Sequence, residues 1–240
     1  KAGGYTDPRW WSEAAAAGLW TAEGFQQRND PGANVLTAPM GMAAEPYSLP
    51  NHPVVRVGWY EAVAYTRWLT ELAREHGWLA PGWTIHLPNE PEWEKAARGG
   101  ESVLEQPCIA RLADLHSCLH DDGRAVSANP MAQRIFPWGG ALEGNLANLS
   151  GSGIGLTSAL GCFPHGSSPY GAMDLCGNVW EWTRSLRSKM GYDLDFPYPY
   201  VATDGREDAM APFGAARVVR GGSWYHVPLF ARASYRSGNP

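Results

Sequence analysis

Glycine and proline recur so closely along this sequence that long regular elements have little room to form. The 240 residues contain 28 glycines and 19 prolines, together with 12 tryptophans. Glycine and proline favour turns and loops, whereas large aromatic rings supply apolar area against which an irregular backbone can pack. We therefore expect a loop-rich fold in which irregular segments pack on aromatic side chains.

The overall composition excludes several classes of protein. Hydrophobic residues make up 44% of the chain and charged residues 18%, which is typical of a globular protein. The net charge is −5 and basic residues form no run, so we expect no binding of nucleic acid through phosphate contacts. No apolar stretch approaches the roughly 20 residues that span a bilayer, so we expect no membrane insertion.

Two segments in the first half of the chain carry helix signals. Residues 8–17 follow Asp7, a residue type that caps helices, and have a proline at the first helical position. Residues 59–75 carry apolar side chains at steps of three and four, which predicts a helix with one apolar face. Gly77 follows this segment as a C-terminal cap.

A third helix is predicted by a capping box. Asn89 is followed three residues later by Glu92, and the two side chains of such a pair cap the backbone reciprocally. Gly99 and Gly100 end this helix. Residues 101–135 have a weak helical signal and are interpreted as an insertion.

The remaining regular structure consists of short strands between loops. Strand-like stretches are predicted at residues 54–57, 84–87, 179–183, 217–220 and 230–236. Helices that precede short strands set in long loops indicate a single α+β domain over residues 1–240.

Six sequence blocks occur in a family-specific order along nearly the whole chain. Together they resemble the formylglycine-generating-enzyme (sulfatase-modifying factor) domain. The blocks are Gly4–Trp11, Pro53–Ala62, Leu87–Gly99, Phe136–Gly139, Tyr170–Gly171 running on to Gly177–Trp182, and Arg220–Trp224.

This resemblance implies a C-type-lectin-like fold of the formylglycine-generating-enzyme subtype, with two or three helices, short antiparallel strands and long ordered loops. Members of the family close with a strand that carries a Gly-Phe-Arg motif, which these 240 residues do not contain. We therefore expect that upstream residues and the final strand lie outside this sequence.

The resemblance also implies several functions, of which two are metal-dependent oxidations. Formylglycine-generating enzymes bind copper through a cysteine pair after the Gly-Gly-Ser turn, but residues 224–240 contain no cysteine. A second branch makes sulfoxides with non-haem iron, and its iron ligands lie largely in a separate helical-bundle domain. His226 alone cannot form a site of two histidines and one carboxylate. A metal-dependent oxidase of this superfamily is the alternative function.

The leading interpretation is a variable protein of a diversity-generating retroelement, which displays replaceable residues near its C-terminus. The adenines of Asn codons are the main targets of that system, and nine residues here fit codons derived from AAC or AAT. A rigid scaffold tolerates such surface changes. Trp224, Arg232 and Arg236 are expected to belong to the constant frame. The predicted ligand-binding residues are Tyr225, His226, Val227, Pro228, Leu229, Phe230, Ser237, Gly238 and Asn239.

The other interpretation of this segment is structural, with Leu229 and Phe230 as core residues of a strand. On the display hypothesis the protein is not an enzyme, and its partner is a protein or another macromolecule. The cytoplasm is favoured over the cell surface as its location.

The resemblance further implies a structural calcium site around the Gly-Asn-x-Trp-Glu-Trp motif. The ligands would be the side chains of Asp174 and Glu181 with the carbonyl groups of Gly177 and Val179. Calcium prefers such hard oxygen ligands. The alternative for Glu181 is a salt bridge or a turn cap.

Two cysteines and two histidines cluster in the predicted insertion at Cys108, His116, Cys118 and His120. Zinc accepts this set of donors, although their spacing matches no common zinc finger. A Cys108–Cys118 disulfide is possible in an oxidising compartment. Two reduced, half-buried cysteines are favoured over both.

Overall fold

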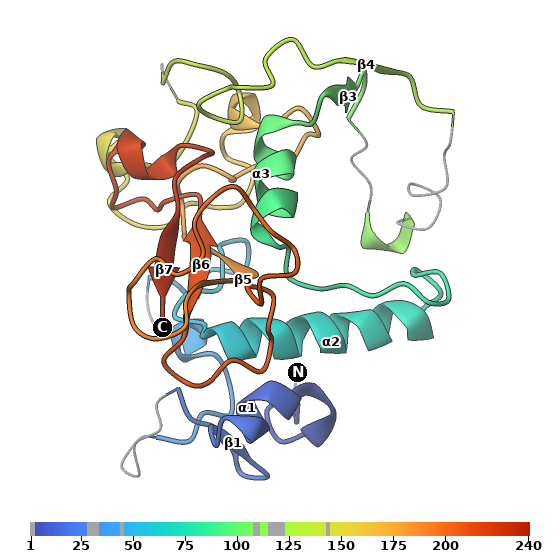
Figure 1. Cartoon of the computed structure of the whole chain (residues 1–240), viewed down its shortest axis with the longest axis vertical. Helices are drawn as coiled ribbons and strands as arrows, with labels where there is room; N and C mark the ends of the chain where they lie inside the picture. The colour runs from blue at the N-terminus through green and yellow to red at the C-terminus, as the bar shows by residue number, and fades with distance from the viewer. Residues whose placement is uncertain (1–2, 28–33, 44–45, 108–110, 115–122, 143–144) are drawn as a thin grey trace.

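The computed structural model of the protein describes residues 3–27, 34–43, 46–107, 111–114, 123–142 and 145–240 (Figure 1). Within these residues there are three α-helices, α1 (Ser12–Ala16), α2 (Trp59–Glu75) and α3 (Glu90–Arg98). Single 3₁₀ turns lie at Pro8–Trp10, Met40–Ala43, Leu112–Asp114, Ser150–Ser152, Pro164–Gly166 and Pro228–Ala231.

The strands are short and pair only antiparallel. The described strands are β1 (Trp20–Thr21), β2 (Gly24–Phe25), β3 (Ser102–Leu104), β4 (Val126–Ala128), β5 (Glu181–Ser188), β6 (Ala216–Arg220) and β7 (Ser237–Asn239). They form two hairpin-like pairs, β1–β2 and β3–β4, and one sheet in the order β5-β6-β7. Few helices, short antiparallel strands and long loops confirm the α+β fold class.

Helices α2 and α3 form where the sequence predicts them. The backbone N–H of Gly58 donates to the Glu61 carboxylate at 2.7 Å, which caps the first turn of α2. The capping box of α3 is present, because Asn89 accepts from the Glu92 N–H at 2.8 Å and Glu92 accepts from the Asn89 N–H at 2.8 Å. In Figure 1, α3 stands to the right of the three-stranded sheet and α2 runs below it.

Aromatic side chains pack the irregular N-terminal segment, as the composition predicts. Trp10, Trp11 and Phe25 are buried together with Ala64 of α2. The rings of Trp11 and Phe25 stack at 5.1 Å. Trp59 at the start of α2 donates through its indole N–H to the Thr183 carbonyl at 3.0 Å, which ties the start of α2 to β5.

The predicted N-terminal helix at residues 8–17 is interrupted. A 3₁₀ turn at Pro8–Trp10 is followed by α1, because Trp11 leaves the helical region with φ −113° and ψ 24°. Trp11 directs its indole N–H to the Gly4 carbonyl at 2.9 Å. The single helix predicted here is therefore wrong, although both halves are helical turns.

Two of the predicted strands do not form, and two others are displaced. At 54–57, Arg56 adopts φ 57°, a conformation that a strand does not contain. At 84–87, the Ile85 N–H bonds to the Thr70 hydroxyl of α2 at 2.9 Å instead of to a neighbouring strand. The strand predicted at 179–183 begins only at Glu181, after Asn178 with φ 61°.

The predicted strand at 230–236 is also wrong. Residues 228–231 form a 3₁₀ turn, since a proline stands at its start, and β7 begins only at Ser237. The strand predicted at 217–220 is confirmed as β6.

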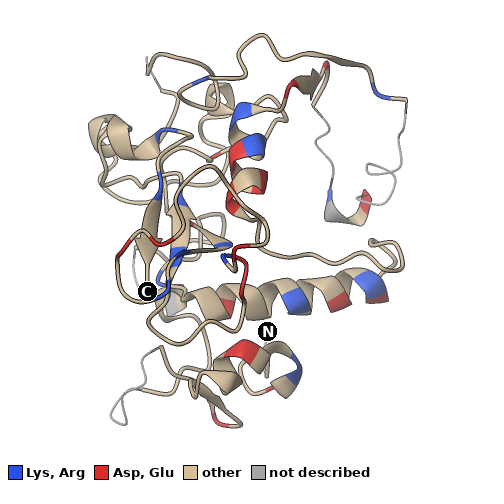
Figure 2. Cartoon of the chain, viewed as in Figure 1, with Lys and Arg blue, Asp and Glu red and all other residues tan. Residues whose placement is uncertain are grey.

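Charged side chains of both signs are mixed along α2 and α3 (Figure 2). Arg74 and Glu71 pair on α2, and Arg98 and Glu94 pair on α3. No helix among the described residues has the length and apolar character to cross a membrane.

Candidate functional site

The C-terminal loop starts at a turn that requires glycine. Gly221 and Gly222 have φ values of 90° and 76°, which disfavour residues with a side chain. A Cβ on Gly222 would also lie 3.1 Å from the Cα of Ala231. The turn therefore lets the loop from Ser223 fold back tightly onto the buried Ala231.

Four half-buried rings, which we call the aromatic quartet, form the centre of this loop: Trp180, His226, Phe230 and Tyr235. Neighbouring rings contact one another in a closed circuit, with centroids 5.2 Å, 5.1 Å, 5.1 Å and 6.2 Å apart. The contacts are edge-on or tilted, a favourable geometry for aromatic pairs. The quartet is therefore a packed aromatic surface and not four independent side chains.

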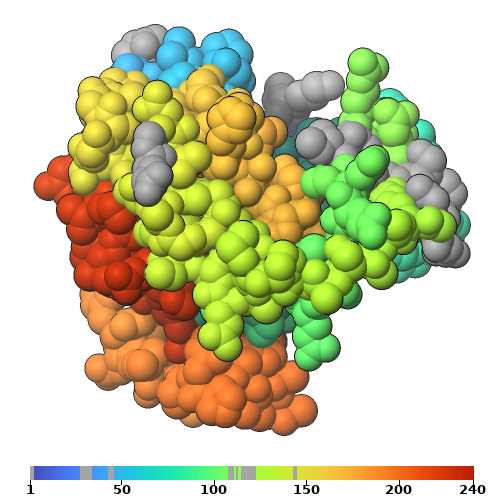
Figure 3. All heavy atoms as spheres, turned by 90° about the horizontal axis from the view of Figure 1, so that it is seen from above, coloured from blue at the N-terminus to red at the C-terminus, as the bar shows by residue number. Residues whose placement is uncertain are grey.

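His226 is the titratable member of the quartet. Its Nδ1 lies 2.6 Å from the Ser223 hydroxyl, a hydrogen-bond distance. Burial lowers the pKa of His226 below its ordinary value, so the imidazole is neutral at pH 7. The His226 carbonyl accepts from the Ser150 N–H at 3.1 Å. In Figure 3 the C-terminal segment, in red, reaches the surface beside residues 125–160, in yellow-green and yellow.

The nine predicted ligand-binding residues fall into two groups. Tyr225, Val227 and Leu229 are exposed by 73%, 50% and 49% and surround the quartet, to which His226 and Phe230 belong. Pro228 is half-buried at the start of the 3₁₀ turn. The second group, Ser237, Gly238 and Asn239, forms β7, where each residue is paired with β6.

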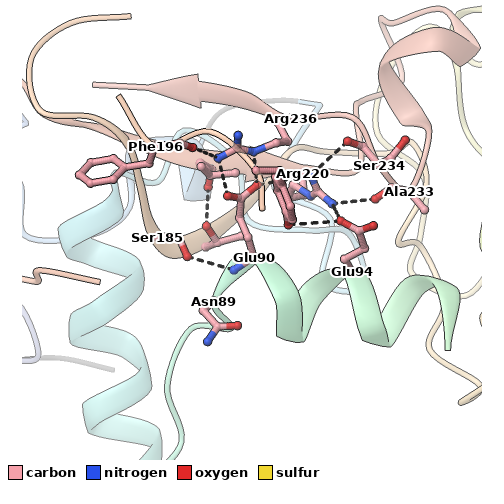
Figure 4. A network of polar contacts seen from close by, with 12 residues as sticks. Asn89, Glu90, Glu94, Ser185, Phe196, Arg220, Ala233, Ser234 and Arg236 are labelled. Carbon is pink, nitrogen blue, oxygen red and sulfur yellow. Dashed lines mark hydrogen bonds and ion pairs between the residues drawn. The ribbon is translucent and has the colours of Figure 1, made fainter. Parts of the chain in front are cut away.

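A buried network of charged side chains, which we call the anchor network, lies below the loop (Figure 4). Glu90, at the start of α3, is fully buried and accepts two hydrogen bonds of 2.6 Å from the Arg236 guanidinium. Arg220 of β6 is also fully buried and donates to Glu94 at 2.8 Å. Such bidentate and charge-assisted bonds fix the geometry of the groups that they join.

The anchor network also holds the backbone of the loop. Arg220 donates to the carbonyl of Ala233 at 2.7 Å, and Arg236 donates to the carbonyl of Phe196 at 2.9 Å. Tyr235 of the quartet directly precedes Arg236. Arg236, which is predicted to belong to the constant frame, makes these buried contacts, whereas Arg232 is exposed at the surface.

The two side chains predicted to bind calcium lie near each other. Glu181 accepts from the Trp93 indole N–H at 2.5 Å, and Asp174 accepts from the Gly161 N–H at 2.7 Å. Burial, with a smaller contribution from the Asp174 charge, raises the pKa of Glu181 to about 7. A divalent cation would relieve the repulsion between the two carboxylates. The calcium site with Gly177 and Val179 stays a prediction.

The described residues do not form a copper–thiolate or iron site. They contain no group of three or more His, Cys, Asp or Glu side chains placed to hold a metal. Cys162 is exposed, and Cys176 is a buried thiol whose pKa burial raises to about 12. The cluster of Cys108, His116, Cys118 and His120 lies outside the described residues.

A groove beside β7 is a feature that the sequence reasoning missed. Its volume is about 760 Å³, and it lies between the start of α2, the loop 190–192, the loop 211–215 and β7. Aromatic side chains and two arginines line it, and Asn239 is the one predicted ligand-binding residue that reaches it. No local sequence pattern marks it, because its walls come from six separate segments.

Comparison with known proteins gives three findings. The family profile of the sulfatase-modifying factor enzyme 1-like domain matches residues 2–240. Hercynine oxygenase from Mycolicibacterium smegmatis is 32% identical over 98% of this chain and 44% of its own length. Formylglycine-generating enzyme from Thermomonospora curvata is 31% identical over 78% of this chain and 49% of its own length. The chain thus spans less than half of these two relatives.

Among solved structures, Treponema denticola variable protein 1 is similar with a TM-score of 0.43 and 18% identity. The similarity covers 82% of this chain and 68% of that one.

The relatives overturn the prediction that the protein is not an enzyme. Hercynine oxygenase and formylglycine-generating enzyme are both enzymes, at about 30% identity to this chain. The prediction depended on the absence of cysteine after the Gly-Gly-Ser turn. That absence excludes one thiol-dependent chemistry and leaves other chemistries open.

Proposed function

Because the chain belongs to the sulfatase-modifying factor enzyme 1-like domain family, we propose that it is a substrate-binding domain of an oxygen-using enzyme similar to the hercynine oxygenases. The observation that carries this proposal is a C-terminal loop without a thiol, in a chain that aligns with hercynine oxygenase over 98% of its length. The first feature argues against formylglycine chemistry, and the second favours the iron-dependent branch.

The aromatic quartet is the surface that would contact the substrate. Hercynine carries a trimethylammonium group and an imidazole ring, and both interact favourably with aromatic faces. The quartet is half-exposed, and its neutral His226 adds a polar atom to an otherwise apolar surface. The anchor network keeps these rings in place before substrate binds, which lowers the entropic cost of binding.

The metal is not assigned to the described residues, because their donor groups do not fit a metal site of three side chains. In this proposal the domain binds and orients the substrate, and the metal ligands come from other parts of the full-length protein. No step of the reaction is therefore assigned to His226 or Ser223.

The test is hercynine-dependent oxygen consumption by the full-length protein supplied with ferrous iron and a small thiol as sulfur donor. We expect Trp180→Ala and Phe230→Ala to raise KM for hercynine about tenfold or more, with a smaller effect on kcat. Val227→Ala is the matched control on the same loop, because Val227 is exposed and outside the quartet. Oxygen consumption that does not depend on hercynine would contradict the proposal.

Display of a diversified ligand-binding surface is the second candidate function. The exposure of Tyr225, Val227 and Leu229 around a firmly held frame favours it, since these side chains are replaceable at little cost in stability. This hypothesis requires a near-copy of the coding stretch for residues 224–239 beside a reverse transcriptase, with differences confined to adenines. A genome without such a copy rules the display hypothesis out.

A further inference from the structure

The groove beside β7 differs in chemistry from the aromatic quartet. Its walls include the rings of Tyr60, Trp182, Tyr192 and Phe213. Tyr192 and Phe213 are exposed by 66% and 43%, so two large apolar groups face solvent here. A concave site of this volume with mostly apolar walls has the size of a small-molecule pocket.

Two arginines line the same groove, Arg56 and Arg217, and neither forms an ion pair with a carboxylate among the described residues. Arg217 is only 4% exposed. Its guanidinium donates to the carbonyl groups of Arg184 and Asp208, both at 2.8 Å, and lies 3.9 Å from the centroid of the Trp59 ring. These bonds use two of its five donor hydrogens.

A buried cation that is held only by carbonyl groups and a ring is unusual, because burial penalises an unpaired charge. Burial lowers the pKa of Arg217 to about 10. The Tyr60 hydroxyl opposes this effect most, followed by the carboxylates of Asp208, Glu207 and Glu13, none of which forms an ion pair with Arg217. The guanidinium remains protonated at pH 7. An anion bound in the groove would supply the missing charge partner.

Arg56 presents a second cation at the groove. Its φ of 57° places it in the left-handed region, and Gln27 holds this conformation by donating to the Arg56 carbonyl at 3.0 Å. Its side chain is exposed and forms no ion pair with the described residues. The two arginines thus offer one buried and one exposed contact for a planar anion.

We propose that this groove binds a small molecule that combines a carboxylate with a flat apolar ring. Arg56 and Arg217 contact the carboxylate, while the rings of Tyr192 and Phe213 cover the apolar part. The groove is separate from the aromatic quartet, so this site does not depend on the function proposed above.

Two probes of nearly equal shape test the proposal in the full-length protein, indole-3-acetate and indole-3-acetamide. Titration calorimetry, without added metal, measures their affinities. We expect the carboxylate to bind about tenfold tighter than the amide, since a charge-assisted bond is roughly twice as strong as a neutral one. Arg56→Gln removes an exposed charge and should reduce this preference to about threefold or less.

Two further variants make the result decisive. Arg232→Gln removes an exposed arginine outside the groove and should leave the carboxylate preference unchanged. Phe213→Ala should weaken both probes by the same factor, because it removes an apolar wall and no charge. Three results would each overturn the proposal. They are equal affinities for acid and amide, an unchanged preference in Arg56→Gln, and no binding of either probe at about 10 mM. Loss of hercynine-dependent activity alone would not, because this assay involves no turnover.

Discussion

Single residues shape the C-terminal loop and the groove at positions where the backbone leaves the common conformations. Gly222 adopts φ 76° against the buried Ala231, and Arg56 adopts φ 57° at the edge of the groove. The glycine pair is visible in the sequence as a turn signal, whereas the conformation of Arg56 is not, because arginine has no preference for this region. That difference explains why the turn was predictable and the interruption at residues 54–57 was not.

Gly222→Ala should destabilise the protein by about 1–3 kcal/mol more than Gly205→Ala does. Both glycines have positive φ, so both variants pay the backbone cost of a side chain in that region. Only at Gly222 does the new Cβ meet neighbouring atoms, since nothing lies within 4 Å of a Cβ at Gly205. Urea unfolding of the two variants measures the difference, and equal losses would contradict a close packing of the turn.

Glu181 should make the calcium-free protein less stable as the pH rises. Its pKa is about 7 in the folded state and 4.5 in its ordinary range, so the folded state binds a proton more tightly. Stability is therefore full below pH 4.5 and falls as the pH rises towards 7. Melting curves in chelator between pH 4.5 and 8 measure this slope. Glu181→Gln should flatten it, and an unchanged slope in that variant would assign it to other groups.

The anchor network joins elements that lie far apart in the sequence. Glu90 of α3 and Arg236 before β7 are separated by 146 residues in the sequence and form two hydrogen bonds of 2.6 Å. The capping box predicts where α3 begins, and the Arg220–Trp224 block predicts where the loop begins. Neither pattern predicts that Glu90, the first residue of α3, pairs with Arg236 at the end of the loop, because that pairing arises only in the tertiary fold.

Glu90→Gln should cost about 3–5 kcal/mol, because it leaves the largely buried Arg236 without a charged partner. The double variant Glu90→Met with Arg236→Met removes both charges and should be more stable than Glu90→Gln. Glu71→Gln, which breaks an exposed pair with Arg74, is the control and should change stability by about 0–1 kcal/mol. Denaturant unfolding of the three variants is the measurement. A Glu90→Gln loss no larger than that of the control would mean that the network does not hold the loop.

At the scale of the whole molecule, the family blocks predicted the fold class. Apolar periodicity and the capping box predicted α2 and α3, because both signals lie in the local sequence. The aromatic quartet could be predicted only in part, because His226 and Phe230 were recognised as surface residues while their contacts with Trp180 and Tyr235 were not. The groove could not be predicted, because Arg56, Trp182, Phe213 and Asn239 come together only in the folded chain. Sequence reasoning thus located the loop and missed the surfaces that distant segments build.

Calcium should stabilise the whole fold if the predicted site is correct, because its ligands connect the loop at Asp174 to the first residue of β5, Glu181. Glu181 also accepts from Trp93 of α3, so the ion would join the sheet, the loop and the helix at one point. A ligand that binds only the folded state raises stability by about 2.7 kcal/mol at 100 times its dissociation constant. The melting temperature should therefore rise when calcium is added to chelated protein. Asp174→Asn together with Glu181→Gln should abolish this rise, and a rise that persists in the double variant would place the ion elsewhere.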